Sequence, residues 1–209
     1  MEKLGVFGGT FNPIHNGHLS LCTQLSNALQ IPRVLLIPTA VPPHKQAPDL
    51  ADGAHRLAMC SLAAQADPRF LACDLELRRS GSSYTVETLR ELETLYPDTK
   101  IYLFMGTDMF LTVQNWYCAQ EIFRRAVLVA GARQKGEEEK LRAHLSYLQK
   151  KGAEGRVVCC DVVEISSTQI RAARRQGLPL AGMVPLAVEE YIEEKKLYLP
   201  KEEHADGIG

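Results

Sequence analysis

Short apolar runs alternate along the chain with longer segments whose apolar residues recur at helical spacing. The runs predict strands over residues 3–7, 33–37, 70–75, 101–105, 126–130 and 156–165. Helices are predicted over residues 17–30, 54–66 and 185–196, and another after the break at residues 80–83. The charged residues 136–152 predict a surface helix, and residues 166–171 open a further one. Residues 34–37 are apolar at every position, which is typical of a parallel strand buried on both faces. The alternation therefore predicts an α/β fold, an open parallel sheet with helices on both faces and a small C-terminal helical part.

The helix expected after the break at residues 80–83 places four apolar residues on one stripe, Val86, Leu89, Leu92 and Leu95. At 209 residues the chain fits one domain, which we expect over residues 1–200. The C-terminal helical part is expected over about residues 166–199. Residues 201–209 form a polar tail that we expect to be disordered.

Charge and hydropathy limit the partners that we expect. The chain has 24 Lys and Arg against 25 Asp and Glu, so no overall field favours nucleic acid or an acidic membrane. No apolar stretch approaches the roughly 20 residues of a membrane span, and no secretory leader is evident. We therefore expect a soluble, cytoplasmic protein with no nucleic-acid or membrane partner, in which any anion site is local. An oligomer is possible, but no feature supports one.

The chain has six cysteines, and they lie in apolar segments without any Cys-x-x-Cys pair. We interpret them as buried thiols in preference to a metal-binding or redox set. The six are Cys22, Cys60, Cys73, Cys118, Cys159 and Cys160.

The first predicted strand leads through a glycine break and a turn at Pro13 into a helix that opens near Asn16. Gly8 and Gly9 would let the backbone approach a ligand, and the following helix start offers unpaired N–H groups to an anion. Two histidines lie three residues apart there, a spacing that places their rings on one side of the first turn. This pattern predicts an anion site, although a capping pair, a surface pair or two metal ligands are alternatives.

Two further segments carry candidate chemistry. Residues 166–171 read Ser-Ser-Thr-Gln-Ile-Arg, and Ser166 and Gln169 have the spacing of a capping box at a second helix start. Alone, this segment could be only a well-capped helix with an exposed arginine. Residues 38–52 hold four prolines and are too long and polar for a simple connector, so we expect them to be functional. We expect the loops after Phe7, Ile37, Met105 and Ile165 to lie at the carboxyl edge of the sheet.

Residues 8–18 read Gly-Gly-Thr-Phe-Asn-Pro-Ile-His-Asn-Gly-His, which resembles the signature of the nucleotidylyltransferase superfamily with its His-x-Gly-His element. They match neither the dinucleotide-binding fingerprint of dehydrogenases nor a P-loop. Residues 165–171 resemble the same superfamily's Ile-Ser-Ser-Thr-x-Ile-Arg element. The middle of the chain is similar to bacterial nicotinate-nucleotide adenylyltransferases, through Pro42-Pro43-His44-Lys45, Ser83-Tyr84-Thr85, Gly106-Thr107-Asp108 and Asn115-Trp116-Tyr117. The resemblance runs from Lys3 to about Tyr198 and implies a Rossmann-like fold.

The resemblance also implies roles for individual residues. His15 and His18 are the implied catalytic residues. The residues implied for ATP are Gly8, Gly9, Phe11, Gly106, Asp108, Ser167, Thr168 and Arg171. The residues implied for nicotinate mononucleotide are Thr10, His44, Lys45, Thr85, Trp116, Tyr117 and Arg133. No acidic cluster predicts a dedicated metal site, and Mg²⁺ is expected to arrive with ATP.

Several of these residues keep a structural alternative. Trp116 would stack on the nicotinate ring, although a core aromatic is the commoner use. The N–H groups of Thr85 and Tyr117 would receive the pyridine carboxylate, which favours the acid over the amide. Lys45 and His44 would clamp phosphates or remain solvated, and Asp108 would lie near a ribose or only cap a helix.

The implied reaction transfers AMP from ATP to nicotinate mononucleotide and yields deamido-NAD and pyrophosphate, a step of NAD biosynthesis. The attacking phosphate has a second pKa of about 6 and is already ionised, so the histidines would act as donors that stabilise the transition state. Alternatives are another acceptor (nicotinamide mononucleotide or phosphopantetheine), a non-catalytic nucleotide-binding module, or a small metal-binding protein.

The chain departs from this family at two places. Position 12 is Asn where many relatives carry Asp. After the fifth predicted strand, the chain reads Ala132-Arg133-Gln134 where relatives usually have two basic residues and then proline.

Overall fold

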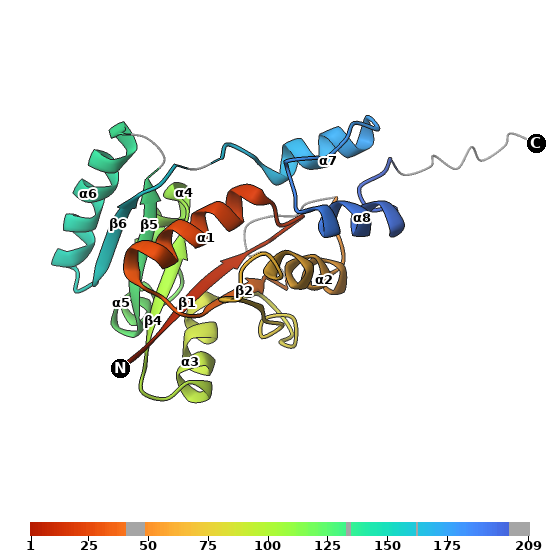
Figure 1. Cartoon of the computed structure of the whole chain (residues 1–209). Coiled ribbons are helices and arrows are strands. Elements are labelled where there is room, and N and C mark those ends of the chain that lie inside the picture. The colour runs from red at the N-terminus through yellow and green to blue at the C-terminus, as the bar shows by residue number, and fades with distance from the viewer. Residues whose placement is uncertain (41–48, 133–134, 162, 201–209) are drawn as a thin grey trace, which may run out of the picture.

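A parallel β-sheet forms the centre of the protein (Figure 1). We describe a computed structural model that covers residues 1–40, 49–132, 135–161 and 163–200. Within these residues the sheet has six strands in the order β3-β2-β1-β4-β5-β6, and every pairing is parallel. The strands are β1 (Glu2–Gly9), β2 (Val34–Pro38), β3 (Phe70–Ala72), β4 (Thr99–Met105), β5 (Ala126–Ala132) and β6 (Gly155–Cys159). The open parallel sheet predicted from the sequence is confirmed.

Helices cover both faces of this sheet. They are α1 (Asn16–Leu29), α2 (Gly53–Ala64), α3 (Thr85–Leu95), α4 (Thr107–Phe110), the 3₁₀ helix η1 (Val113–Asn115), α5 (Ala119–Arg125), α6 (Lys135–Lys150), α7 (Ser167–Arg175) and α8 (Leu186–Glu194). One hydrophobic cluster packs α1, α2, α7 and α8 against strand residues such as Phe7 and Leu36. A second cluster packs α3, α5 and α6 against Val6 and Leu35. Because strand side chains alternate in direction, consecutive residues serve opposite clusters.

The strand order changes direction beside β1, which pairs with β2 on one side and with β4 on the other. In open α/β sheets, ligands bind in the crevice outside the carboxyl ends of the strands at such a switch point. The loops after β1, β2 and β4 leave that edge, and α7 and α8 lie beyond the end of β1 (Figure 1). The fold therefore places the first turn and residues 106–108 at one crevice.

Several predicted boundaries are wrong. The glycine break is absent, because β1 continues through Gly8 and Gly9, which pair with Ile37 and Pro38 of β2. The strand expected over residues 70–75 ends at position 72, and the one expected over residues 156–165 ends at position 159. Apolar composition extends beyond each strand, but the pairing with the neighbouring strand does not.

Leu95 does not belong to the buried stripe of α3. Val86, Leu89 and Leu92 are fully buried, whereas Leu95 is 57% exposed. Each step of three residues turns the side chain by about 300°, so the stripe drifts backwards and its fourth member lies roughly opposite the first.

The short helices α4 and α5 were not predicted at all.

The prediction that all six cysteines are buried is partly wrong. Cys22, Cys60 and Cys160 are buried and Cys73 is half-buried, whereas Cys118 and Cys159 are exposed. Burial raises the pKa of the Cys60 thiol to about 12. Cys159 ends β6, an edge strand with one neighbour, and Cys118 precedes α5 with a left-handed φ of 53°.

The polar tail 201–209 lies outside the described residues. None of the helices in the described part of the chain has the length and apolar character needed to cross a membrane.

Candidate active site

The first turn ends in a pair of stacked histidines at the start of α1. His15 is the N-cap, and its Nδ1 accepts from the backbone N–H of His18 at 3.3 Å. The Nδ1 of His18 accepts from the backbone N–H of His15 at 3.3 Å, which completes a capping box. The ring centroids are 3.6 Å apart. The capping alternative is therefore confirmed, and it has a chemical consequence: a neutral ring whose Nδ1 accepts carries its proton on Nε2 and is a donor there.

Aromatic side chains hold the ring of His18. Phe11 meets it edge-on with centroids 5.2 Å apart, and Phe7 does so at 5.8 Å. Phe11 is only 2% exposed, so its backbone is the part of the residue that we would expect to approach ATP. Gly9 has its own reason to lack a side chain, because a Cβ there would lie 3.0 Å from the Phe11 ring. Gly8 is exposed and a Cβ there would meet nothing within 4 Å.

Gly17, which lies between the histidines, is required by close packing. A Cβ at this position would lie 2.9 Å from the carbonyl oxygen of Val163 and 3.1 Å from Nδ1 of His15. The first contact is with backbone, which cannot rotate away. The position therefore has to be glycine for the His15 ring to lie over the first turn of α1.

Gly17→Ala is expected to lower the free energy of unfolding by about 1–3 kcal/mol, the usual cost of overpacking a closed site. Urea denaturation measures the change. The matched control is Gly136→Ala in α6, where a Cβ would meet nothing within 4 Å. Because alanine is the better helix former, the control should be neutral or stabilising by up to about 1 kcal/mol. Equal effects of the two substitutions would contradict the packing argument.

The start of α7 lies against the first turn. Its predicted capping box is confirmed, with Ser166 Oγ accepting from the N–H of Gln169. The hydroxyl of Ser167 donates to the carbonyl of Pro13 at 2.9 Å. Arg171 Nη1 donates to the carbonyl of Asn12 at 2.9 Å. The two signatures, which are far apart in the sequence, are thus in direct contact.

Asn12 has a structural role that accounts for its amide. The side chain is 4% exposed, and its Nδ2 donates to the carbonyl of Asp49 at 2.9 Å. Its Oδ1 accepts from the N–H of Ala51 at 3.0 Å and from the Tyr198 hydroxyl at 2.9 Å. Because burial raises the pKa of Tyr198, that hydroxyl stays protonated as the donor. A carboxylate could accept both bonds but could not donate to Asp49.

Arg56 of α2 bonds to the loops that follow β1 and β2, although it was not predicted as a site residue. It is 1% exposed, and within the described part of the chain it donates only to backbone carbonyls. These carbonyls belong to Thr10, Thr39, Ala40 and Ala51, at distances of 2.9, 2.6, 3.3 and 2.9 Å respectively. Desolvation lowers its pKa from the usual value. The only signal in the sequence was a charged residue on the apolar side of a predicted helix.

Residues 106–109 line a cavity of about 280 Å³ at the end of β4, together with Glu137 of α6. Gly106 and Asp108, both implied for ATP, are among the residues that line this cavity. Thr107 Oγ1 is buried and has no hydrogen-bond partner among the described residues. A larger cavity of about 450 Å³ beside Asp52, Asp74 and Arg78 contains none of the predicted site residues.

An aromatic contact of Tyr117 brings two of the segments implied for the pyridine ring together. Tyr84 and Tyr117 have ring centroids 4.7 Å apart, which brings the start of α3 beside Tyr117. Trp116 is half-buried and packs against the second hydrophobic cluster, so it is partly a core residue. Thr85 begins α3, and Ser83 before it accepts from the N–H of Ala40 at 3.0 Å. Tyr84 is a further site candidate that the sequence analysis quoted but did not select.

Comparison with known proteins identifies the family. A family model described as cytidylyltransferase-like matches residues 6–173. A protein from Synechococcus sp. named "probable nicotinate-nucleotide adenylyltransferase" is 37% identical over 200 residues, 95% of this chain and 95% of its own. One of the same name from Symbiobacterium thermophilum is 36% identical over 209 residues, 99% of this chain and 100% of its own. This chain belongs to the nicotinate-nucleotide adenylyltransferase family.

A solved structure supports the fold of this adenylyltransferase family for the chain. It is the nicotinic acid mononucleotide adenylyltransferase of Plasmodium falciparum complexed with NaAD. The TM-score is 0.77 at 18% identity, over 95% of this chain and 98% of that one. At this identity the likeness bears on the fold alone, and it agrees with the predicted Rossmann-like class.

Three site residues implied by the resemblance to the adenylyltransferase family lie outside the described residues. They are His44, Lys45 and Arg133. Thr168 and Asp108 are exposed at the starts of α7 and α4.

Proposed function

We propose that this protein transfers AMP from ATP to nicotinate mononucleotide, releasing pyrophosphate and forming deamido-NAD in NAD biosynthesis. The observation that carries the proposal is the stacked pair of His15 and His18 at the switch point of the sheet. Both Nδ1 atoms accept backbone N–H groups, which leaves Nε2 of each neutral ring as the protonated nitrogen. Membership of the nicotinate-nucleotide adenylyltransferase family supports the choice of acceptor.

The histidines act as donors in this proposal. The 5′-phosphate of the acceptor has a second pKa of about 6, so the attacking oxygen is ionised at neutral pH and needs no base. The Nε2–H groups hold the reacting phosphates in line and stabilise the charge that grows on the α-phosphoryl oxygens. Loss of an Nε2–H donor would therefore lower kcat. The fraction of acceptor whose 5′-phosphate is ionised would not change.

The remaining residues divide between the two substrates. ATP is held by the backbone of Gly8, Gly9 and Phe11, by residues at the end of β4 and by the start of α7. The side-chain candidates among them are Asp108, Ser167, Thr168 and Arg171. Nicotinate mononucleotide is held by Thr10, Thr85, Trp116 and Tyr117, together with His44, Lys45 and Arg133. The contacts of Ser167 and Arg171 with Pro13 and Asn12 support this arrangement, because they bring the phosphate-binding helix to the first turn.

Mg²⁺ is proposed to enter bound to the ATP phosphates, whose hard oxygens are the ligands it prefers. Bound there, it would withdraw charge from the leaving pyrophosphate. Among the described residues, no group of three or more His, Cys, Asp or Glu is placed to hold a metal ion. The protein's own contribution to the leaving group is the cationic side chain of Arg171 and the hydroxyls of α7.

Pyrophosphate release from ATP tests the proposal directly. Nicotinate mononucleotide, nicotinamide mononucleotide and phosphopantetheine are compared as acceptors under the same conditions. We expect turnover with nicotinate mononucleotide to exceed the others, because backbone N–H groups pair better with a carboxylate than with a carboxamide. Preference for another acceptor would assign the chain a different adenylyl transfer. Binding of both nucleotides without any release would make it a non-catalytic module.

Trp116→Ala is expected to raise KM for nicotinate mononucleotide by roughly tenfold and to leave KM for ATP within about twofold, since the change removes one stacking surface. Steady-state kinetics with each substrate varied in turn measure both values. The control is Tyr147→Ala, which removes an exposed aromatic of α6 and should change neither. Equal effects of Trp116→Ala on both substrates would return Trp116 to a purely structural role.

A further inference from the structure

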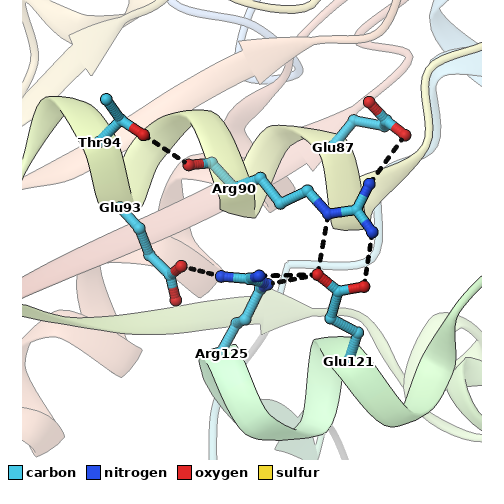
Figure 2. A network of polar contacts seen from close by, with 6 residues as sticks. All are labelled: Glu87, Arg90, Glu93, Thr94, Glu121 and Arg125. Carbon is cyan, nitrogen blue, oxygen red and sulfur yellow. Dashed lines mark hydrogen bonds and ion pairs between the residues drawn. The ribbon is translucent and has the colours of Figure 1, made fainter.

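A network of charged side chains joins α3 to α5 (Figure 2). Glu121 of α5 lies between the guanidinium groups of Arg90 and Arg125, and Figure 2 shows these side chains filling the space between the two helices. Glu87 and Glu93, both on α3, extend the network. The Arg90–Glu121 and Glu93–Arg125 pairs join α3 to α5, which a pair within one helix would not do.

Glu121 is the centre of this network. Arg90 binds it with both prongs, Nε to Oε1 at 2.8 Å and Nη2 to Oε2 at 2.6 Å. Arg125 contributes a second fork to Oε1, at 2.8 Å from Nε and 2.7 Å from Nη2, and also pairs with Glu93. The hydrogen bonds from Arg90 hold the pKa of Glu121 below its usual value. Paired forks of this kind fix orientation as well as distance.

The network lies a few residues along the chain from the residues proposed to hold the pyridine carboxylate. Thr85 is the first residue of α3, and Arg90 follows it on the same helix. Trp116 and Tyr117 immediately precede Cys118, the N-cap of α5, and Glu121 lies in the first turn of that helix. One proposed N–H donor therefore belongs to the first residue of α3, and the other to Tyr117, which directly precedes the N-cap of α5. The spacing between α3 and the start of α5 sets the distance between these donors.

We propose that Glu121, through its paired bonds with Arg90, is a positioning residue that holds the Thr85 and Tyr117 halves of the pyridine carboxylate site at their working separation. This inference rests on the proposed function. None of the network residues is among those proposed for the reacting phosphates, so we expect its effect to be confined to recognition of nicotinate mononucleotide.

Helix α5 needs such a tether. It has 7 residues, and helices shorter than about 12 residues are marginal in isolation. Its N-cap has no side-chain capping bond. Ile122 and Phe123 anchor it in the second hydrophobic cluster, which fixes its depth against the sheet. The sideways position relative to α3 is set by the tilted contact of Tyr84 with Tyr117 and by the Glu121 network. Glu121 belongs to neither hydrophobic cluster, so its replacement should leave the core and the fold intact.

Glu121→Gln tests the inference, because it keeps the shape of the side chain and removes its charge. We expect KM for nicotinate mononucleotide to rise by about fivefold, with kcat and KM for ATP within about twofold, since contacts in one network couple moderately. Arg90→Gln should give the same pattern from the α3 side, and the double variant should resemble either single one. Arg90→Lys should fall between, because an ammonium cannot form the fork.

The matched control is Arg142→Gln, which breaks the Arg142–Glu138 pair within α6 and should leave all three constants unchanged. Trp116 is the single tryptophan of the chain, so its fluorescence reports binding of nicotinate mononucleotide in the absence of turnover. The dissociation constants from this titration should follow the KM values. Thermal unfolding of each variant identifies any folding defect. The Glu121 and Arg90 substitutions break the same ion pair from opposite sides, so each serves as a check on the other.

Wild-type turnover with nicotinate mononucleotide separates the two hypotheses. If the wild type fails to use this acceptor, the proposed function and the positioning role are both overturned. If the wild type uses it, the positioning role alone is overturned by unchanged KM values in folded variants. It is also overturned by equal rises for both substrates or by additive effects in the double variant.

Discussion

Replacing His18 with alanine is expected to leave a folded protein whose kcat is lower by roughly two to three orders of magnitude, the usual effect of removing one oriented donor at developing charge. The ring is held by the stacked His15 and by the edges of Phe7 and Phe11. It therefore loses little entropy on reaching the transition state, which is the source of the large effect. Single-turnover formation of deamido-NAD measures the chemical step.

A stability control must accompany this variant, because His18 also completes the capping box of α1. Loss of the cap should lower the free energy of unfolding by about 1 kcal/mol, which does not unfold a domain of this size. His55→Ala is the matched control. It removes a half-buried histidine that bonds to the Tyr191 hydroxyl at 2.9 Å, outside the first turn, and should leave kcat unchanged. Near-normal turnover in His18→Ala would contradict the assignment of the site.

Arg56→Met is expected to give the largest loss of stability, about 3 kcal/mol or more in the free energy of unfolding. Methionine retains the apolar stem but removes every donor, so the carbonyls of Thr10, Thr39, Ala40 and Ala51 lose a charged partner in a buried place. Bonds to charged groups contribute roughly 1.5–3 kcal/mol each, and the total is reduced because the arginine itself is desolvated. Chemical denaturation followed by circular dichroism measures the change.

Arg78→Met provides the comparison for Arg56→Met. Arg78 forms an exposed ion pair with Asp74 at 2.5 Å, and solvent screens such pairs so that they contribute little to stability. We expect the loss from Arg78→Met to be much smaller than that from Arg56→Met. If both arginines gave similar small losses, the carbonyls around Arg56 would be adequately solvated without it. The interpretation of Arg56 as the residue that fixes these loops would then be wrong.

The sequence identified those parts of the site that are contiguous in the chain. The histidine pair and the capping box at Ser166 depend on residues within one helical turn, so spacing alone predicts them. Phe11 was assigned to ATP because it lies within the motif, yet its ring packs beneath His18. Motif membership identifies a residue's neighbourhood, but the direction of its side chain depends on packing.

Residues that work through distant partners were missed for the same reason. Asn12 bonds to Tyr198 and Asp49, and Arg56 bonds to carbonyls from three other segments. Glu121 of α5 pairs with Arg90 of α3. Apart from Ala51, which lies five residues before Arg56, these partners are far along the chain, and no local spacing encodes their approach. The exposure of Cys159 escaped prediction in the same way, because strand order decides that β6 lies at an edge of the sheet.

The sequence by itself determined the alternation of strands and helices, the parallel sheet and the two signatures at helix starts. Hydrophobic periodicity and helix capping are local properties, and local properties can be read from order alone. Only the tertiary structure decided that the signatures touch through Ser167 and Arg171, that Gly17 has no room for a side chain, and that α3 is tied to α5. These contacts arise when the strand order reverses at β1 and brings distant segments to one edge, where burial and hydrogen-bond geometry select among the residues that the sequence offers.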